Sequence, residues 1–136
     1  MLNLSRSEFA RASIVKEIKR MDKKESVYLA RAVGGIGIFE REDGGGLYKI
    51  GRSKDPVRRL AQLNSPSTKL PYTLELVCSF ESANADLTER MLQKYFESKA
   101  TPNSHEYFML SSSDVQLITM RSFPPEIIHS IYQEYA

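Results

Sequence analysis

The stretch that most constrains the fold is residues 47–63, LYKIGRSKDPVRRLAQL. It reads as a short strand that ends at Gly51, followed by a helix that opens at Asp55 and Pro56. A capped helix directly after a strand places free backbone N–H groups and the positive helix end at one corner. The basic side chains of that corner are Lys49, Arg52, Lys54, Arg58 and Arg59. Such a corner attracts phosphate.

Length and composition limit the class of protein. A chain of 136 residues can form one domain with a real hydrophobic core and no metal or disulfide staple. No apolar run approaches the roughly 20 residues that span a bilayer, and the N-terminal residues lack a signal-peptide core. We therefore expect a cytoplasmic protein without a membrane partner. The net charge of +2 is too small to indicate nucleic-acid binding by itself. Evidence for such binding must come from local clusters of basic residues.

Hydrophobic periodicity predicts the element order β-β-α-β-α-β-α-α after an N-terminal helix. The expected strands are 26–33, 47–51, 72–80 and a short one within 100–110; the expected helices are 55–64, 84–99, one within 111–122 and one from 124. This order predicts an α+β fold with a small, mainly antiparallel sheet of three to four strands flanked by helices. We divide the chain into an N-terminal helix and linker (1–25), a central domain (26–118) and a C-terminal helical extension (119–136).

The N-terminal helix is predicted over residues 5–22. Ser5 and Glu8 have capping-box spacing, and an imperfect apolar stripe runs along the segment. The stripe needs a surface to pack on, either the main domain or a second copy of the chain. A homodimer through this helix is therefore one expectation.

The connection at residues 34–46 holds six of the seven glycines. No glycine pattern typical of phosphate-binding loops introduces a helix here, so we expect a hairpin connection and no nucleotide pocket.

Alternation along the strands predicts which side chains face the core. On the first two strands the core-facing set is Val27, Leu29, Tyr48 and Ile50. Tyr28, Ala30 and Lys49 fall on the opposite face, where we expect a shallow, open groove. Similar reasoning assigns to the core Val57, Leu60, Leu63, Leu74, Leu76, Cys78, Phe80, Leu87, Met91, Leu92, Tyr95 and Phe96. The single cysteine, Cys78, excludes an internal disulfide and is expected to be a buried thiol.

Five segments follow one another along the chain: SVYLARAV, LYKIGRSKDPVRRLAQL, LELVCSFES, LTERMLQKYF and HEYFML. In order and spacing, they resemble the GIY-YIG nuclease superfamily. The resemblance covers about residues 26–118 and is strongest to the phage T5 open-reading-frame-172 type branch, in which the second motif reads KIG. It implies the GIY-YIG-like fold for the central domain.

The resemblance also implies site residues. Residues 26–28 stand for the first motif, with Tyr28 as its tyrosine, and residues 49–51 stand for the second, with Lys49 at its start. Arg59 occupies the position of the family's helix arginine, with Arg58 as a near alternative. Glu89 stands where the family has its metal-binding glutamate. The family's later asparagine has no clear counterpart, and Glu106 or Asn103 can take its place.

The implied activity is metal-dependent hydrolysis of DNA phosphodiester bonds, with Mg²⁺ as cofactor and Mn²⁺ as a substitute. Tyr28 would act as general base, helped by a positive charge from Lys49, because an unperturbed tyrosine has a pKa near 10. Arg59 and Lys49 would hold the phosphate, and Glu89 the metal. The expected contacts with nucleic acid are Arg52, Lys54, Arg58 and His105.

Each of these residues also has a plain structural explanation. Tyr28 can be a packing aromatic of a strand, the arginines a solvated helix face, and Glu89 a surface charge. Their recurrence together at the family's spacing favours an active site. Two departures are Ser26 in place of the first-motif glycine and the long glycine-rich connection. The alternative is a catalytically inactive module of the same fold that binds nucleic acid or a partner.

Overall fold

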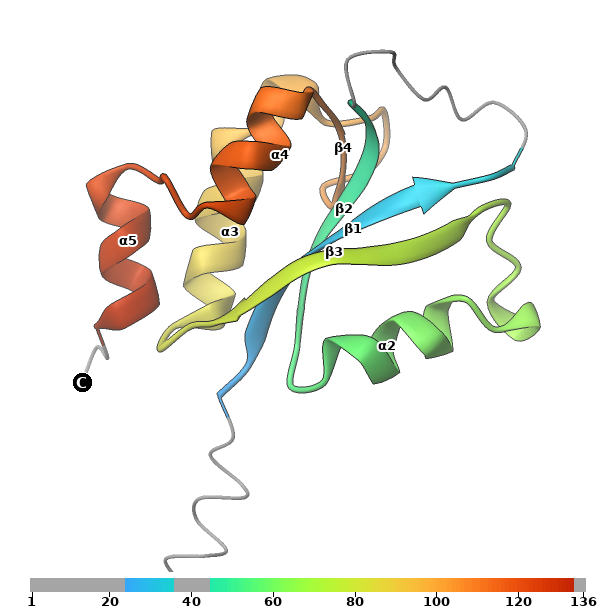
Figure 1. The fold of residues 1–136 in the computed structure, drawn as a ribbon, viewed down its shortest axis with the longest axis horizontal. Coiled ribbons are helices and arrows are strands. Elements are labelled where there is room, and N and C mark those ends of the chain that lie inside the picture. The colour runs from blue at the N-terminus through green and yellow to red at the C-terminus, as the bar shows by residue number, and fades with distance from the viewer. Residues whose placement is uncertain (1–23, 36–44, 134–136) are drawn as a thin grey trace, which may run out of the picture.

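The computed structural model describes residues 24–35 and 45–133. The elements follow the predicted order (Figure 1): β1 (Ser26–Val33), β2 (Gly46–Ser53), α2 (Pro56–Leu63), β3 (Thr73–Glu81), α3 (Ala85–Tyr95), β4 (Tyr107–Leu110), α4 (Ser112–Thr119) and α5 (Pro125–Tyr132). Short 3₁₀ turns occupy Pro66–Thr68 and Glu97–Lys99. The predicted N-terminal helix, any dimer contact through it and the middle of the glycine-rich connection lie outside the described residues.

The four described strands form one antiparallel sheet in the order β3-β1-β2-β4. The fold is therefore α+β, as predicted. In Figure 1, helix α2 lies on one side of the sheet, and α3, α4 and α5 lie on the other. The helices of the described part are too short and polar to cross a bilayer.

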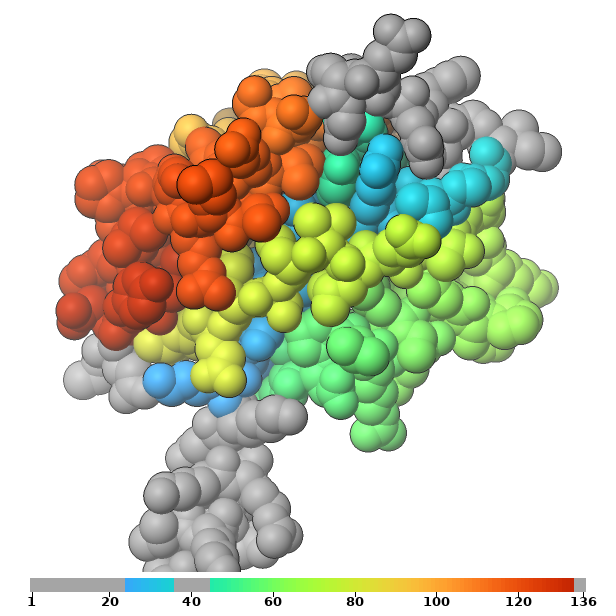
Figure 2. Space-filling model, in the orientation of Figure 1, coloured from blue at the N-terminus to red at the C-terminus, as the bar shows by residue number. Residues whose placement is uncertain are grey.

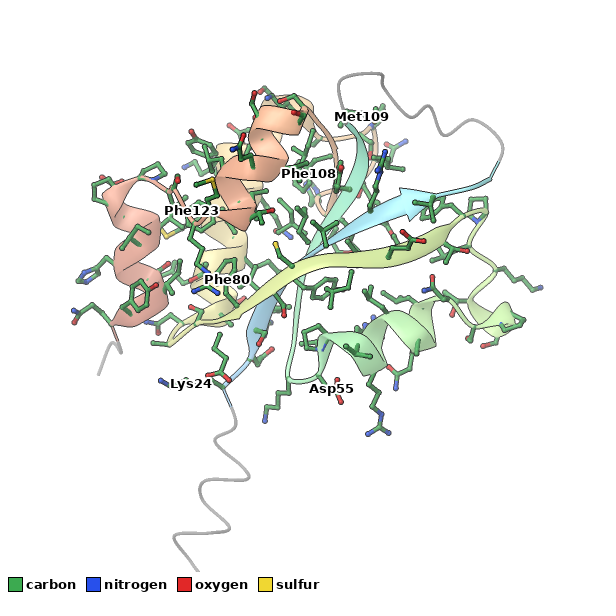
Figure 3. The ribbon with its side chains drawn as sticks, in the orientation of Figure 1. Lys24, Asp55, Phe80, Phe108, Met109 and Phe123 are labelled. Carbon is green, nitrogen blue, oxygen red and sulfur yellow. The ribbon has the colours of Figure 1, made fainter. Side chains whose placement is uncertain are left out.

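The larger core lies between the sheet and helices α3, α4 and α5. Its buried members include the four residues predicted for β1 and β2, namely Val27, Leu29, Tyr48 and Ile50. The rings of Phe80 and Phe123 lie 5.8 Å apart, and Phe108 is buried in the same core; all three are labelled in Figure 3. Burial of this apolar area is the main stabilising contribution on this face.

The smaller core lies under α2. Its buried residues are Tyr28, Ala30, Ala32, Leu60 and Leu74. Tyr28 is 2% exposed and Lys49 is 5% exposed. The expected shallow, open groove is therefore wrong, because α2 covers this face of the sheet with Leu60 and Leu63.

Strand β3 breaks the simple alternation predicted for it. Leu29 pairs with Cys78, but the next residue, Ala30, pairs with Leu76, so Val77 is an extra, bulged residue. The bulge places Leu74 in the core under α2 and Phe80 in the core under the other helices. Leu76 is 38% exposed, and Cys78 is only half-buried, contrary to prediction. In Figure 2, β3 runs across the visible surface between α2 and α4.

Two further core predictions are wrong. Val57 is 68% exposed, because the core contacts of α2 come from its later residues Leu60 and Leu63. Tyr95 is 48% exposed at the last residue of α3, where the next residue, Phe96, enters the core instead. The two rings meet edge to face, with centroids 4.9 Å apart.

Three buried hydroxyls fix the position of α3. Thr88 Oγ1 lies 2.8 Å from Ser82 Oγ and 2.7 Å from Ser130 Oγ. Ser82 also donates to the backbone oxygen of Ser130. Because these groups are satisfied inside the protein, α3 is held against α5 and the end of β3. Glu89, the predicted metal-binding residue, directly follows Thr88 on this helix.

Candidate active site

Tyr28 and Gly51 lie opposite each other on β1 and β2. A Cβ atom on Gly51 would lie 2.6 Å from both Cζ and Oη of Tyr28, which is far inside normal contact distance. Glycine is therefore required here because the Tyr28 ring lies directly over the backbone of β2. The strand itself does not end at Gly51 but continues to Ser53.

The Tyr28 hydroxyl lies in a mixed electrostatic environment. Burial raises the pKa of Tyr28 to about 12, and the Arg59 guanidinium lowers it through its charge and a side-chain hydrogen bond. The carboxylates of Glu106 and Glu89 raise it further. The cation that acts most strongly on Tyr28 is thus Arg59, rather than Lys49 as expected. At neutral pH, Tyr28 is almost entirely protonated.

Lys49 is a buried cation with a carboxylate partner. Its Nζ donates to Glu106 Oε2 at 2.7 Å and lies 5.4 Å from the centroid of the Tyr107 ring. The side chain of Glu106 is 54% exposed, so the pair reaches from the interior to the surface. Ser104 Oγ accepts from the backbone N–H groups of Glu106 and Tyr107, which shapes the turn before β4.

Glu89 points from α3 toward the same region. Burial raises the pKa of Glu89, and Arg52 lowers it. Glu106 raises this pKa and Lys49 lowers it, so both lie within electrostatic range. The side chain of Glu89 is 15% exposed. A largely buried carboxylate that still reaches solvent is a group that can bind a metal ion.

The two faces of the sheet meet at the outer edge of β2. Strand β4 pairs with β2 only from Gly46 to Lys49. Beyond that point, the backbone N–H of Ile50 donates to the backbone oxygen of Glu106 at 2.9 Å, and the side-chain amide of Gln93 on α3 donates to the backbone oxygen of Ile50 at 3.2 Å. Because β4 is short, Glu89 from one face can approach Tyr28 and Lys49 from the other.

The four predicted catalytic residues are linked by electrostatic effects. Arg59 and Glu89 both act on the pKa of Tyr28, and Lys49 acts on the pKa of Glu89 and is paired with Glu106. The predicted groove is replaced by a covered site whose exposed rim includes Arg59.

The residues predicted to contact nucleic acid have different surroundings. Lys54 and Arg58 are exposed at the start of α2, where Asp55 caps the helix by accepting from the Arg58 N–H at 3.2 Å. His105 is exposed beside a surface hollow of about 350 Å³, whose lining includes Gln93 and Lys94. Arg52 is paired with carboxylates, chiefly Glu25.

A family model for the T5orf172 domain matches residues 34–121, well over half of the chain. The chain belongs to the T5orf172 family. This family is related to the GIY-YIG nucleases, so membership suggests a nuclease, with nucleic acid as partner and a divalent metal as cofactor. The match begins at residue 34, directly after β1, and the pairing of β1 with β2 brings Tyr28 beside the matched segment. No curated protein and no solved structure matches the chain.

The donor set of the T5orf172 domain fits a hydrated Mg²⁺ better than a fully protein-bound metal. Among the described residues, no group of three or more His, Cys, Asp or Glu side chains is arranged to hold a metal ion. Magnesium commonly takes one or two carboxylates and keeps several waters. Glu89 can supply such a carboxylate, with Glu106 within electrostatic range of it.

The sequence did not predict how the charged side chains of the candidate site are paired. Glu106 stood only as one alternative for the family's asparagine, whereas in the structure it is the partner of Lys49. The two residues are 57 positions apart, and nothing in a single sequence links them. The other alternative, Asn103, occupies the turn with a positive φ of 63°.

Proposed function

We propose that this T5orf172 domain is an endonuclease that hydrolyses phosphodiester bonds of DNA with a divalent cation, Mg²⁺ or Mn²⁺. The observation that supports this most is the electrostatic linkage of four side chains near the start of β4: Arg59 and Glu89 act on Tyr28, and Lys49 acts on Glu89. These side chains come from β1, α2, α3 and β2, so no local sequence preference explains their convergence. Family membership suggests the same class of activity.

In the proposed mechanism, Tyr28 takes a proton from the attacking water. A tyrosine with a pKa of about 12 is rarely deprotonated at neutral pH but is a strong base when it is. Arg59 is the cation that favours this deprotonated form. Its exposed side chain also lies where a phosphate can approach, and a planar guanidinium suits the oxygens of a phosphate.

Glu89 would hold the divalent ion, which, when bound, stabilises negative charge on the leaving oxygen. Lys49 would add a fixed positive charge close to the phosphate, with Glu106 as its partner. Lys54, Arg58 and His105 would contact the nucleic-acid backbone outside the site, because all three are exposed.

The test is a cleavage assay with labelled single- and double-stranded DNA and Mg²⁺ or Mn²⁺. We expect Tyr28→Phe to reduce the rate by about 10²- to 10⁴-fold, the range for loss of a general base, and Glu89→Gln to abolish metal-dependent cleavage. Tyr132→Phe and Glu126→Gln are matched controls, because both residues are exposed on α5. Intact DNA with the wild-type protein, or equal rates in all variants, would overturn the proposal.

A second candidate function is a binding module without catalysis. It is favoured by two observations: Lys49 is already paired with Glu106, and the pKa of Tyr28 is raised to about 12. Such a module would bind DNA in the presence of EDTA, with an affinity that falls as salt rises and is unchanged by Glu89→Gln. Fluorescence anisotropy with and without EDTA distinguishes the two.

A further inference from the structure

Arg52 has an unusual set of partners for a residue beside a proposed phosphate site. It follows Gly51 on β2, on the face of the sheet that α3 covers. Each of the three nitrogen atoms of its guanidinium faces a different carboxylate. The distances are 2.9 Å from Nη1 to Glu25, 3.5 Å from Nη2 to Asp86, and 3.9 Å from Nε to Glu89.

These distances divide the partners into an anchor and two weaker contacts. Nη1 donates to both carboxylate oxygens of Glu25 at 2.9 Å, which fixes the guanidinium near the start of β1. The 3.9 Å contact with Glu89 is too long for a hydrogen bond. Arg52 therefore places a positive charge next to Glu89 without occupying the lone pairs that a metal ion would use.

A fixed positive charge beside a carboxylate weakens the attraction between that carboxylate and a second cation. The Arg52 side chain is 36% exposed, so solvent screens part of this effect.

Building on the proposed function, we propose that Arg52 is a positioning residue that lowers the affinity of Glu89 for the divalent ion in the free protein. The guanidinium acts on Glu89 and not on the phosphate backbone of the substrate, in contrast to the contact expected from sequence. Weak binding in the free protein is compatible with catalysis, because Mg²⁺ sites in phosphate-processing enzymes are commonly completed by substrate phosphates.

The test is a titration of the full chain with Mn²⁺ alone, without nucleic acid, by calorimetry or by electron paramagnetic resonance of free Mn²⁺. We expect Arg52→Gln to lower the Kd by about 3- to 10-fold, since a screened unit charge is removed close to the ligand. Arg52→Lys keeps the charge and should stay within about twofold of wild type. Arg121→Gln is the control, because Arg121 lies against Phe80 and does not contact Glu89.

A merely structural role makes the opposite prediction, because a Glu89 without its neighbour would be less well placed and would bind metal more weakly. Unchanged or weaker binding by a folded Arg52→Gln protein therefore overturns the inference. Thermal denaturation of each variant establishes that it is folded. Glu25→Gln provides a second variant: it leaves the Arg52 charge less neutralised and should weaken Mn²⁺ binding, and tighter binding would contradict the inference.

The same titration separates this inference from the proposed function. Loss of Mn²⁺ binding in Glu89→Gln, together with no change in Arg52→Gln, overturns the inference only. Mn²⁺ binding that is unaffected by Glu89→Gln overturns the metal site of the proposed function, and the role of Arg52 falls with it.

Discussion

The two faces of the sheet are buried by different kinds of side chain. The face under α3, α4 and α5 is closed by aromatic and aliphatic residues from all three helices. The face under α2 has a smaller core with two alanines of β1, and it also holds the buried ammonium of Lys49 and a ring pair, Tyr72 and Tyr107, with centroids 5.9 Å apart. The first face stabilises the domain through apolar burial. On the second face, polar groups of the candidate site take up part of the buried space.

The largest expected effect comes from a matched truncation on each face. Leu60→Ala under α2 and Ile127→Ala in α5 should each cost about 2–5 kcal/mol of unfolding free energy, because both side chains are buried. Only Leu60→Ala should also reduce cleavage per folded molecule, since α2 carries Arg59. Urea unfolding and cleavage assays on the same samples measure the two effects. Equal cleavage losses would mean that the faces are not functionally distinct.

The next effect concerns pH. If Tyr28 is the base, cleavage should rise about tenfold per pH unit from 7 to 9, because the deprotonated fraction grows tenfold per unit below the pKa. The raised pKa of about 12 means that no plateau is reached in this window. Rates measured at constant metal concentration provide the profile. A profile that is flat, or unchanged in Tyr28→Phe, would assign proton removal to another group.

Gly51→Ala should destabilise the protein by about 1–3 kcal/mol, the usual cost of forcing extra atoms into a packed site. The added Cβ would meet the Tyr28 ring at 2.6 Å. Gly46→Ala in the same strand is the control, because the nearest side-chain atoms lie 3.9 Å from its Cβ position. Denaturant unfolding of both variants makes the comparison. Equal stability would show that the ring can move aside.

The smallest expected effect is that of Lys49→Met, which we expect to change the unfolding free energy by no more than about 1 kcal/mol in either direction. The apolar stem of the new side chain can fill the buried space, and Glu106 is 54% exposed and can be hydrated without its partner. Thermal and urea unfolding measure the change. A loss much above this value would show that the pair stabilises the fold, and not only the site.

Much of the architecture was predictable because it depends on local pattern. The element order, the α+β class and the core-facing set on β1 and β2 follow from periodicity and from the turn chemistry around Asp55 and Pro56, and the structure confirms them. The division into segments 1–25, 26–118 and 119–136 stays a prediction. Predictions failed where the outcome depends on contacts between elements. The bulge at Val77 changes which side chains of β3 face each core, and α2 covers the expected groove.

The sequence by itself determined which residue types are available at the site, because the motif spacing around Gly51 and on α3 specifies them. Only the tertiary structure decided how they are paired. Lys49 meets Glu106, Arg59 acts on Tyr28, and Arg52 lies beside Glu89. The physical reason is that charges interact through space, and the short β4 lets side chains from both faces of the sheet come together at the edge of β2.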